Sequence, residues 1–439
     1  MAGCSQLCNS IGVCRTAGLD LTRCAAKAAG MENEPQITAL GSVDAALIDS
    51  IDAPAMLEQV QGWSAINSGT GNLAGLERQA HALADAFAAL PGEIELVEPA
   101  PVTAIDDRGR EYERQFGKHL VMRVRPQTQR RFILTGHMDT VFPADHPFQD
   151  QQWLDDETLN GPGVADMKGG LSVMLHALLA FERSPVSGRV GYDIMINSDE
   201  ETGSLASSDL IARLAGGKAA ALTYEPSALP DGTLAHERGG TGNYSITASG
   251  KSAHAGRNPQ DGRNAIVALS DLVLRLTEMA GEDITVNPAK IEGGSANNVV
   301  PDHAVLRFNI RPKTTHAMER FDNELNDLLR NIEAQHEVGL SRHGGVTRPP
   351  KKVDAKAQKL FDLVKECGAL LGQDIGWKST GGVCDGNNIA ACGVPVVDTM
   401  GVRGGSIHSS DEFLIVPSLK ERAALSALVL QRLATGDKF

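Results

Sequence analysis

The sequence predicts an α/β protein in which a large domain, built on a mixed β-sheet, carries a smaller α/β domain inserted into its chain. Short apolar segments alternate with helical patterns along the first half, an order typical of a largely parallel sheet covered by helices. The order changes after Gly239, where a strand–helix–strand–strand–helix–strand pattern begins. The first pattern resumes after Pro349 and Pro350, so the second domain lies within the first.

The elements of the large domain follow from their periodicity. Residues 55–90 are helical in pattern, with a Gly-rich break at residues 67–72. Residues 168–182 also predict a helix, because their apolar residues recur three and four positions apart. The other expected elements are strands at residues 118–125, 131–135, 190–196 and 220–224 and a helix at residues 354–371.

The inserted domain has its own order of elements. Its expected strands cover residues 241–249, 284–292, 303–311 and 338–343, and its expected helices cover residues 263–280 and 316–335. This βαββαβ order indicates a ferredoxin-like layout. We therefore divide the chain into an extension at residues 1–30, the large domain at residues 31–237 and 348–439, and the inserted domain at residues 238–347.

The composition excludes several classes of function. Among 439 residues, 41 are Lys or Arg and 55 are Asp or Glu, a net charge of −14 without a long basic run. Nucleic-acid binding needs clustered cations and is therefore not expected. The sequence has no uninterrupted apolar stretch of ~18 residues, so we expect no membrane span. Seven cysteines are too few for a disulfide scaffold, which predicts a cytoplasmic protein.

Four of these cysteines lie within residues 1–30: Cys4, Cys8, Cys14 and Cys24. Their spacings match no common zinc or iron–sulfur pattern. The segment also lacks an apolar block long enough for a secretory signal. We therefore expect residues 1–30 to be a disordered extension.

Acidic and imidazole side chains gather where the expected strands end. A histidine, a pair of glutamates and a further glutamate each come shortly after one strand: His137, Glu200 with Glu201, and Glu225. Parallel strands end at one edge of a sheet, where functional groups collect. Carboxylates packed there repel one another, which raises their pKa values, and bound cations relieve the repulsion. A mixed set of imidazoles and carboxylates suits zinc, with manganese or cobalt as substitutes, and this many carboxylates suits two ions that share a bridging carboxylate.

Taken singly, these residues have simpler interpretations. Asp166 precedes a helical pattern and could cap it. Histidines outside the set, such as His119 and His146, are expected to be solvated. Asp139 lies two residues after His137, where its carboxylate could hold the second imidazole N–H. The coincidence of acids at successive strand ends nevertheless favours a metal centre.

Seven short segments resemble motifs of the co-catalytic zinc metallopeptidases, the family of glutamate carboxypeptidase, acetylornithine deacetylase, succinyl-diaminopimelate desuccinylase and aminoacylase. The matching segments occur in the family's order at residues 136–141, 161–170, 199–204, 225–226, 252–256, 298–301 and 405–409. The loops at residues 67–72 and 385–387 are most similar to the glutamate carboxypeptidase branch. In one departure from the family pattern, Cys384 stands where Ser is usual.

The resemblance implies a role for each matching residue. It makes Asp166 the ligand that bridges two divalent metal ions, most often Zn²⁺ in this family. The remaining ligands form two pairs, one for each ion: Glu201 with His408, and His137 with Glu225. Glu200 and Asp139 are then the catalytic residues, with Glu200 as the general base.

In the inserted domain, the resemblance implies a lid that also forms a homodimer. His254 matches an imidazole that helps stabilise the oxyanion across the dimer, and Asn298 matches an amide that contacts the substrate carboxylate. Arg348 matches an arginine that binds the same carboxylate, or it is a solvated hinge residue. Arg311, at the end of its strand, is expected to be an ordinary exposed charge.

These implications predict a metal-dependent hydrolase that cleaves an amide or peptide bond beside a free carboxylate, by attack of a water molecule held by two metal ions. The substrate would be an N-acyl amino acid or a small peptide. An acetylornithine-type deacylase is the alternative within the class. A catalytically silent ligand-binding homologue and a di-metal phosphoesterase are alternatives from other classes.

Overall fold

The computed structural model describes residues 40–436. The expected extension at residues 1–30, with its four cysteines, lies outside the described residues. The proposed domain boundaries stay predictions. In the structure, strand β11 (Thr241–Ser249) opens the inserted part of the chain and strand β14 (Gly339–Arg348) closes it.

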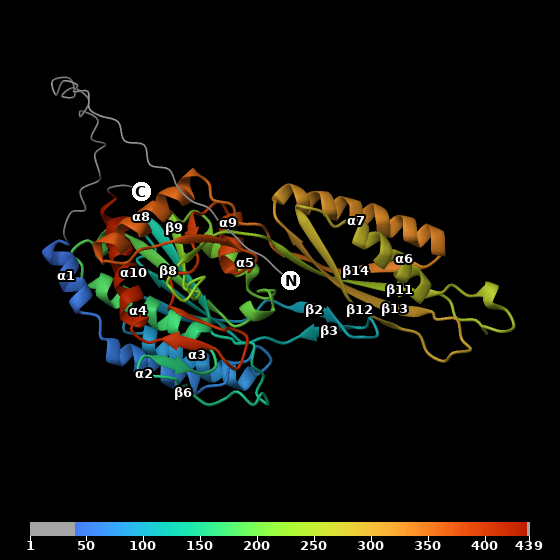
Figure 1. Cartoon of the computed structure of the whole chain (residues 1–439), viewed down its shortest axis with the longest axis horizontal. Helices are drawn as coiled ribbons and strands as arrows, with labels where there is room; N and C mark the ends of the chain where they lie inside the picture. Colours follow the sequence, from blue (N-terminus) through green and yellow to red (C-terminus); the bar gives the residue numbers. More distant parts are fainter. Residues whose placement is uncertain (1–39, 437–439) are drawn as a thin grey trace, which may run out of the picture. The chain divides into compact units, whose positions relative to one another are not determined.

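A six-stranded mixed sheet forms the centre of the large domain (Figure 1). In spatial order its strands are β1 (Glu93–Val97), β4 (His119–Val124), β8 (Gly191–Asn197), β5 (Arg131–His137), β9 (Ala220–Thr223) and β16 (Val396–Val397). The pairs β1–β4 and β4–β8 are antiparallel, and all later pairs are parallel. The predicted α/β class with a mixed sheet is therefore confirmed.

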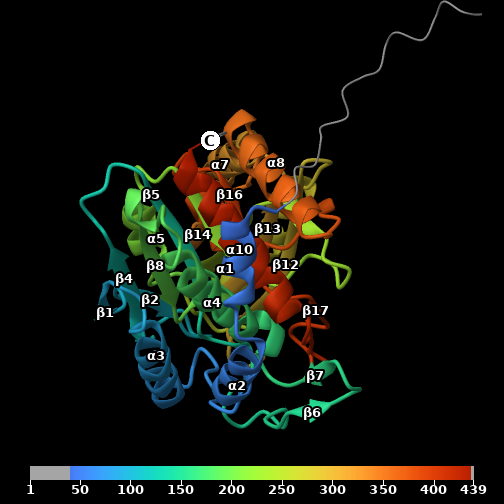
Figure 2. The same ribbon diagram turned by 90° about the vertical axis from the view of Figure 1, so that its left-hand side faces the viewer.

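Both faces of this sheet are buried. Because side chains alternate along each strand, neighbouring residues of one strand enter different cores. Leu120 and Met122 belong to a large core on one face, whereas Val121 belongs to a smaller core on the other. The larger core includes residues of helices α2 (Ala53–Ser64), α3 (Leu73–Phe87), α4 (Gly170–Glu182), α8 (Ala355–Leu370) and α10 (Ser418–Thr435). Figure 2 shows α1 (Ser42–Asp49) against α10 at the end of this layer. The opposite face is covered by α5 (Ser208–Ala215) and α9 (Asp385–Ala391).

By length and composition alone, the helical stretch Val164–Glu182 is long and apolar enough to cross a membrane. Of its most apolar window, 94% is buried inside the protein. Helix α4 contacts both α10 and strand β5 of the central sheet. These contacts are those of a core helix.

The inserted domain has the predicted βαββαβ order. Its antiparallel sheet has the order β12 (Ile284–Gly293), β13 (His303–Pro312), β11 and β14. Helices α6 (Ala265–Glu278) and α7 (Thr315–His336) cover one face and share a core with it. The opposite face carries the polar residues of the strands, and the end of β14 leads back into the large domain (Figure 1).

The sequence analysis missed several short strands. Strands β6 (Gln152–Trp153), β7 (Thr158–Asn160), β17 (Gly404–Gly405) and β18 (Phe413–Ile415) form a small antiparallel sheet, and β10 (Leu234–Arg238) pairs with β15 (Trp377–Thr380). A hairpin of β2 (Val102–Ile105) and β3 (Glu111–Arg114) reaches from the large domain to the inserted one. There Nη2 of Arg307 donates to the carbonyl oxygens of Ile105 and Asp106, each at 3.0 Å.

The expectation that His119 is solvated is wrong. His119 begins strand β4, and its side chain is fully buried. The backbone N–H of Ser198 donates to its Nδ1 at 3.3 Å. Burial lowers the pKa of the imidazole to about 4, because desolvation disfavours its charged form.

This shift predicts a loss of stability at acid pH. The unfolded chain binds a proton at His119 near pH 6.5, but the folded chain binds it only near pH 4. Stability therefore falls by about 3 kcal/mol as the pH falls through this window. Urea unfolding of the metal-free protein at pH 7 and pH 4 should show a smaller pH-dependent loss in His119→Gln than in the wild type. Replacing the exposed His81 by Gln is the control, and equal losses in all three proteins would contradict the prediction.

Candidate active site

The acidic and imidazole residues predicted at the strand ends lie together at one edge of the central sheet. His137 is the last residue of β5, and the two glutamates Glu200 and Glu201 form a turn just after β8. Glu225 follows β9 by one residue. These parallel strands end side by side, which brings their loops to a common point.

Two further residues reach this point from distant segments. Asp166 lies in the irregular turn Val164–Gly169 that leads into α4. His408 follows β17 in the left-handed backbone region, with φ of 64°. Both turns lie at one end of the small β17–β18–β7–β6 sheet, which joins their two loops.

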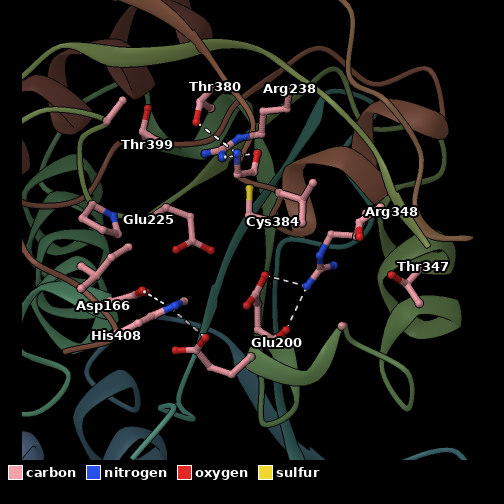
Figure 3. Close-up of a pocket in the computed structure, with 18 of the residues that line it drawn as sticks. Asp166, Glu200, Glu225, Arg238, Thr347, Arg348, Thr380, Cys384, Thr399 and His408 are labelled. Carbon is pink, nitrogen blue, oxygen red and sulfur yellow. Dashed lines mark hydrogen bonds and ion pairs between the residues drawn. The ribbon is translucent and has the colours of Figure 1, made fainter. Parts of the chain in front are cut away.

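Asp166 lies between the two histidines. Its Oδ1 is 3.1 Å from Nε2 of His137, and its Oδ2 is 3.2 Å from Nε2 of His408. Each imidazole also faces one glutamate. Nε2 of His408 is 3.2 Å from Oε2 of Glu201, and Nε2 of His137 is 3.6 Å from Oε2 of Glu225. Figure 3 shows Asp166 and His408 joined, with Glu225 facing them.

The cluster attracts positive charge strongly. Burial raises the pKa of Glu225, and it raises the pKa of Glu201 to about 7. Hydrogen bonds that His408 donates to the carboxylates of Asp166 and Glu201 raise the pKa of its imidazole to about 11. Burial alone would raise the pKa of Asp166, but the two histidines hold it below its usual value. Buried carboxylates that lie this close together are stabilised by positive charge, which divalent cations can supply.

The donor set also fits metal ions by its geometry. One ligand atom each from His137, Asp166 and Glu201 lies within 4.8 Å of the other two. The two oxygens of Asp166 face different histidines. Two imidazoles and three carboxylates form a mixed nitrogen and oxygen set that suits zinc and related ions.

Asp139 supports this cluster in a different way from the one expected. Nδ1 of His137 lies closer to the backbone oxygen of Asp139, at 3.0 Å, than to its carboxylate, at 3.5 Å. The carboxylate instead accepts the backbone N–H groups of Glu200 and Glu201, each at 3.2 Å, and the hydroxyl of Thr70 at 2.7 Å. Asp139 therefore fixes the histidine ring and the glutamate turn together.

Arg348 contacts Glu200, the residue expected to act as the base. Its Nη2 donates to Oε1 of Glu200 at 2.6 Å and its Nη1 to Asp385 at 2.8 Å (Figure 3). Only 1% of Arg348 is exposed, so it is not a solvated hinge residue. Its two terminal nitrogens already contact buried carboxylates, whereas the sequence analysis assigned it to the substrate carboxylate. Burial raises the pKa of Glu200, and the positive charge of Arg348 opposes that rise.

A cavity of about 510 Å³ opens above the cluster. Its floor contains Asp166, Glu200, Glu201, Glu225 and His408. The inserted domain supplies one wall through Thr241, Asn243, Asn309, Arg311 and Thr347. Two domains therefore enclose a common space beside the cluster of acids and imidazoles.

Arg311, which we expected to be an ordinary exposed charge, is exposed as expected and also belongs to this wall. Among the described residues that line the cavity, it is the guanidinium without a carboxylate partner, and its Nε donates to Oδ1 of Asn309 at 3.0 Å. Alternation along β13 sends Phe308 and Ile310 into the core, which leaves Asn309 and Arg311 on the cavity face. This alternation of core and cavity residues along β13 was the sequence signal that could have placed Arg311 on the cavity wall.

His254 and Asn298 do not line this cavity. Both are exposed in the inserted domain, where the backbone N–H of Ala255 donates to the carbonyl of Asn298 at 2.9 Å. The roles implied for them stay predictions, because the role of His254 depends on a second copy of the chain.

Comparison with known proteins agrees with this arrangement. Residues 236–337 match the sequence model of the peptidase dimerisation domain, and residues 119–226 match that of peptidase family M28. The chain is 29% identical to carboxypeptidase G2 from Pseudomonas sp. (strain RS-16) over 337 residues, which cover 73% of this chain and 78% of that protein. It is also 29% identical to a succinyl-diaminopimelate desuccinylase from Psychrobacter sp. (strain PRwf-1) over 330 residues, covering 69% and 79%.

Solved structures show the same fold. A tripeptidase from Staphylococcus aureus superposes with a TM-score of 0.66 at 22% identity, over 88% of this chain and 100% of that one. A dinuclear metal-binding peptidase of the M20 family from Bacillus subtilis superposes with a TM-score of 0.60 at 14% identity, over 87% and 98%.

The fold and the site thus define a metal-dependent hydrolase of amide or peptide bonds. Residues 119–226 and 236–337 thus match peptidase domains of two kinds, and the chain is homologous to carboxypeptidase G2 and succinyl-diaminopimelate desuccinylase.

Proposed function

We propose that this protein cleaves an amide or peptide bond next to a free carboxylate, in an N-acyl amino acid or a small peptide. The observation that carries this proposal is the composition of the cavity. A buried carboxylate, Glu200, faces it on the floor, and an arginine without a carboxylate partner, Arg311, faces it from the inserted domain. A guanidinium suits bidentate recognition of a carboxylate.

The ligand set would hold two divalent ions, with zinc first and cobalt or manganese as alternatives. Asp166 would contact both ions, and His137 with Glu225 and His408 with Glu201 would complete the two sides. Such ions lower the pKa of a bound water molecule and polarise a carbonyl group.

We assign the proton transfer to Glu200. It lies beside Glu201, but Oε1 of its own carboxylate contacts Arg348, and we assign it as the base and not as a metal ligand. In the proposed reaction it accepts a proton from the attacking water molecule and returns it to the leaving amine. Arg311 would meanwhile hold the substrate carboxylate and so fix the position of the scissile bond.

A substrate panel tests this function. The protein is loaded with zinc, manganese or cobalt and incubated with N-acyl-glutamates, dipeptides, N-acetylornithine and carboxamide analogues of each. We expect hydrolysis of substrates that carry the free carboxylate and little turnover of the carboxamides. Preference for N-acetylornithine would favour the deacylase alternative. Equal turnover of carboxylates and carboxamides, or no turnover with any metal, would contradict the proposal.

The role of Arg311 gives a separate prediction. Arg311→Ala should lower kcat/KM for carboxylate substrates by about 10- to 100-fold, because a hydrogen bond to a charged group contributes about 1.5–3 kcal/mol. Turnover of the carboxamides should change little. Arg330→Ala removes the same charge from an exposed position on α7 and is the control. An equal loss for both kinds of substrate would place Arg311 outside carboxylate recognition.

A homodimer through the inserted domain is part of this proposal and is supported by the match to the dimerisation domain. In that dimer, His254 would stabilise the oxyanion and Asn298 would contact the substrate carboxylate. The cytoplasmic location expected from the cysteine content stays a prediction.

A further inference from the structure

A buried glutamate outside the ligand set lies directly behind the candidate metal centre. Glu412 is 1% exposed and does not line the cavity. It lies in the loop that joins β17 to β18, four residues after His408. A buried carboxylate is costly unless hydrogen bonds compensate for the water that it loses.

Those hydrogen bonds come from the turn that presents Asp166. Oε1 of Glu412 accepts the backbone N–H groups of Ala165 and Asp166, each at 2.9 Å, and Oε2 accepts that of Gly163 at 3.0 Å. This turn precedes a helix, where backbone N–H groups lack partners within the chain segment itself. One carboxylate therefore fixes three backbone positions within four residues of the turn.

The backbone of Glu412 is held to the same part of the chain. Nδ2 of Asn160 donates to the carbonyl oxygens of Glu412, at 2.7 Å, and Ser410, at 3.0 Å. Phe413 pairs with Asn160 in the β18–β7 ladder. The loop that carries His408 and the turn that carries Asp166 are therefore joined by both side-chain and backbone contacts.

We infer that Glu412 is a positioning residue of the metal centre, which sets the separation between the bridging carboxylate Asp166 and the ligand His408. Its two oxygens receive three donors, and a single amide oxygen would leave at least one of these donors without a partner. This inference rests on the proposed metal centre. It assigns to Glu412 the pre-alignment of two ligands that come from loops far apart in the chain.

The test measures zinc affinity in place of activity alone. Metal-free protein is titrated with zinc against a competing chelator. We expect wild-type protein to bind two ions and Glu412→Gln to bind them about 10- to 100-fold more weakly, the usual effect of losing an outer partner of a metal ligand. The zinc concentration for half-maximal activity should rise by the same factor, with KM for substrate unchanged at saturating zinc.

Two controls separate this role from a general loss of stability. Glu157→Gln makes the same change at an exposed position in the β6–β7 turn and should leave the affinity unchanged. Leu428→Ala opens the core at α10 and should lower Tm without changing zinc affinity. If Glu412→Gln does not fold, Asn160→Ser weakens the same junction and should shift the affinity in the same direction by a smaller factor.

The outcomes distinguish this inference from the proposed function. Wild-type zinc affinity in folded Glu412→Gln, or in Asn160→Ser when that variant is the one measured, overturns the positioning role. A wild-type protein that binds no zinc overturns the metal centre itself.

Discussion

Glu200→Gln is expected to bind its metal ions as the wild type does and to lose about 10²–10⁴-fold in kcat, the usual contribution of a general base. The glutamine has the same shape but cannot accept a proton at neutral pH. Its carboxamide oxygen can still accept the hydrogen bond that Arg348 donates at 2.6 Å. The five ligand side chains are unchanged, so metal content should stay the same.

The measurement combines kcat with metal analysis of the same sample. Glu157→Gln serves again as the control, because it removes one exposed carboxylate far from the cavity lining. Loss of metal together with activity would place Glu200 in the ligand set. Turnover equal to that of the wild type would remove it from catalysis.

The ligand cluster could be predicted from the sequence because the end of each apolar strand is visible there. His137 and Glu225 directly follow apolar runs, and parallel strands end at the same edge of their sheet. The βαββαβ order of the inserted domain was predictable for a similar reason, since each element is long and periodic. The short strands β6, β17 and β18 were missed because segments of two or three residues carry no readable period.

The partners of charged side chains could not be predicted in the same way. Arg348 meets Glu200 across 148 residues of sequence, and Glu412 meets Asp166 across 246. The sequence around Arg348 or Glu412 does not specify which of several distant groups will lie beside its side chain. The sequence therefore does not tell which of Arg348 and Arg311 contacts Glu200 and which is available for the substrate carboxylate. That distinction depends on how the two domains surround the cavity.

Arg348→Met is expected to destabilise the protein by about 3–5 kcal/mol and to lower kcat. The change leaves the carboxylates of Glu200 and Asp385 buried without their cation, and breaking a buried ion pair on one side typically costs that much. Nη2 of Arg348 also donates to the hydroxyl of Ser204 at 3.0 Å, so the turn after β8 loses a second contact. Denaturant unfolding and steady-state kinetics measure the two effects separately. Arg330→Met, at an exposed site, should change neither quantity.

A double-mutant cycle decides how Arg348 acts. Because Arg348 lies at the end of β14 and contacts Glu200, it connects the inserted domain to the expected base. If it acts by positioning Glu200, Arg348→Met should lower kcat in the wild type but have little further effect in Glu200→Gln, since interacting residues are not additive. If it instead binds the substrate carboxylate, KM should rise in both backgrounds, and only for substrates that carry the carboxylate. Arg348→Lys keeps the charge but cannot reach both carboxylates with one nitrogen, so it should recover only part of the stability.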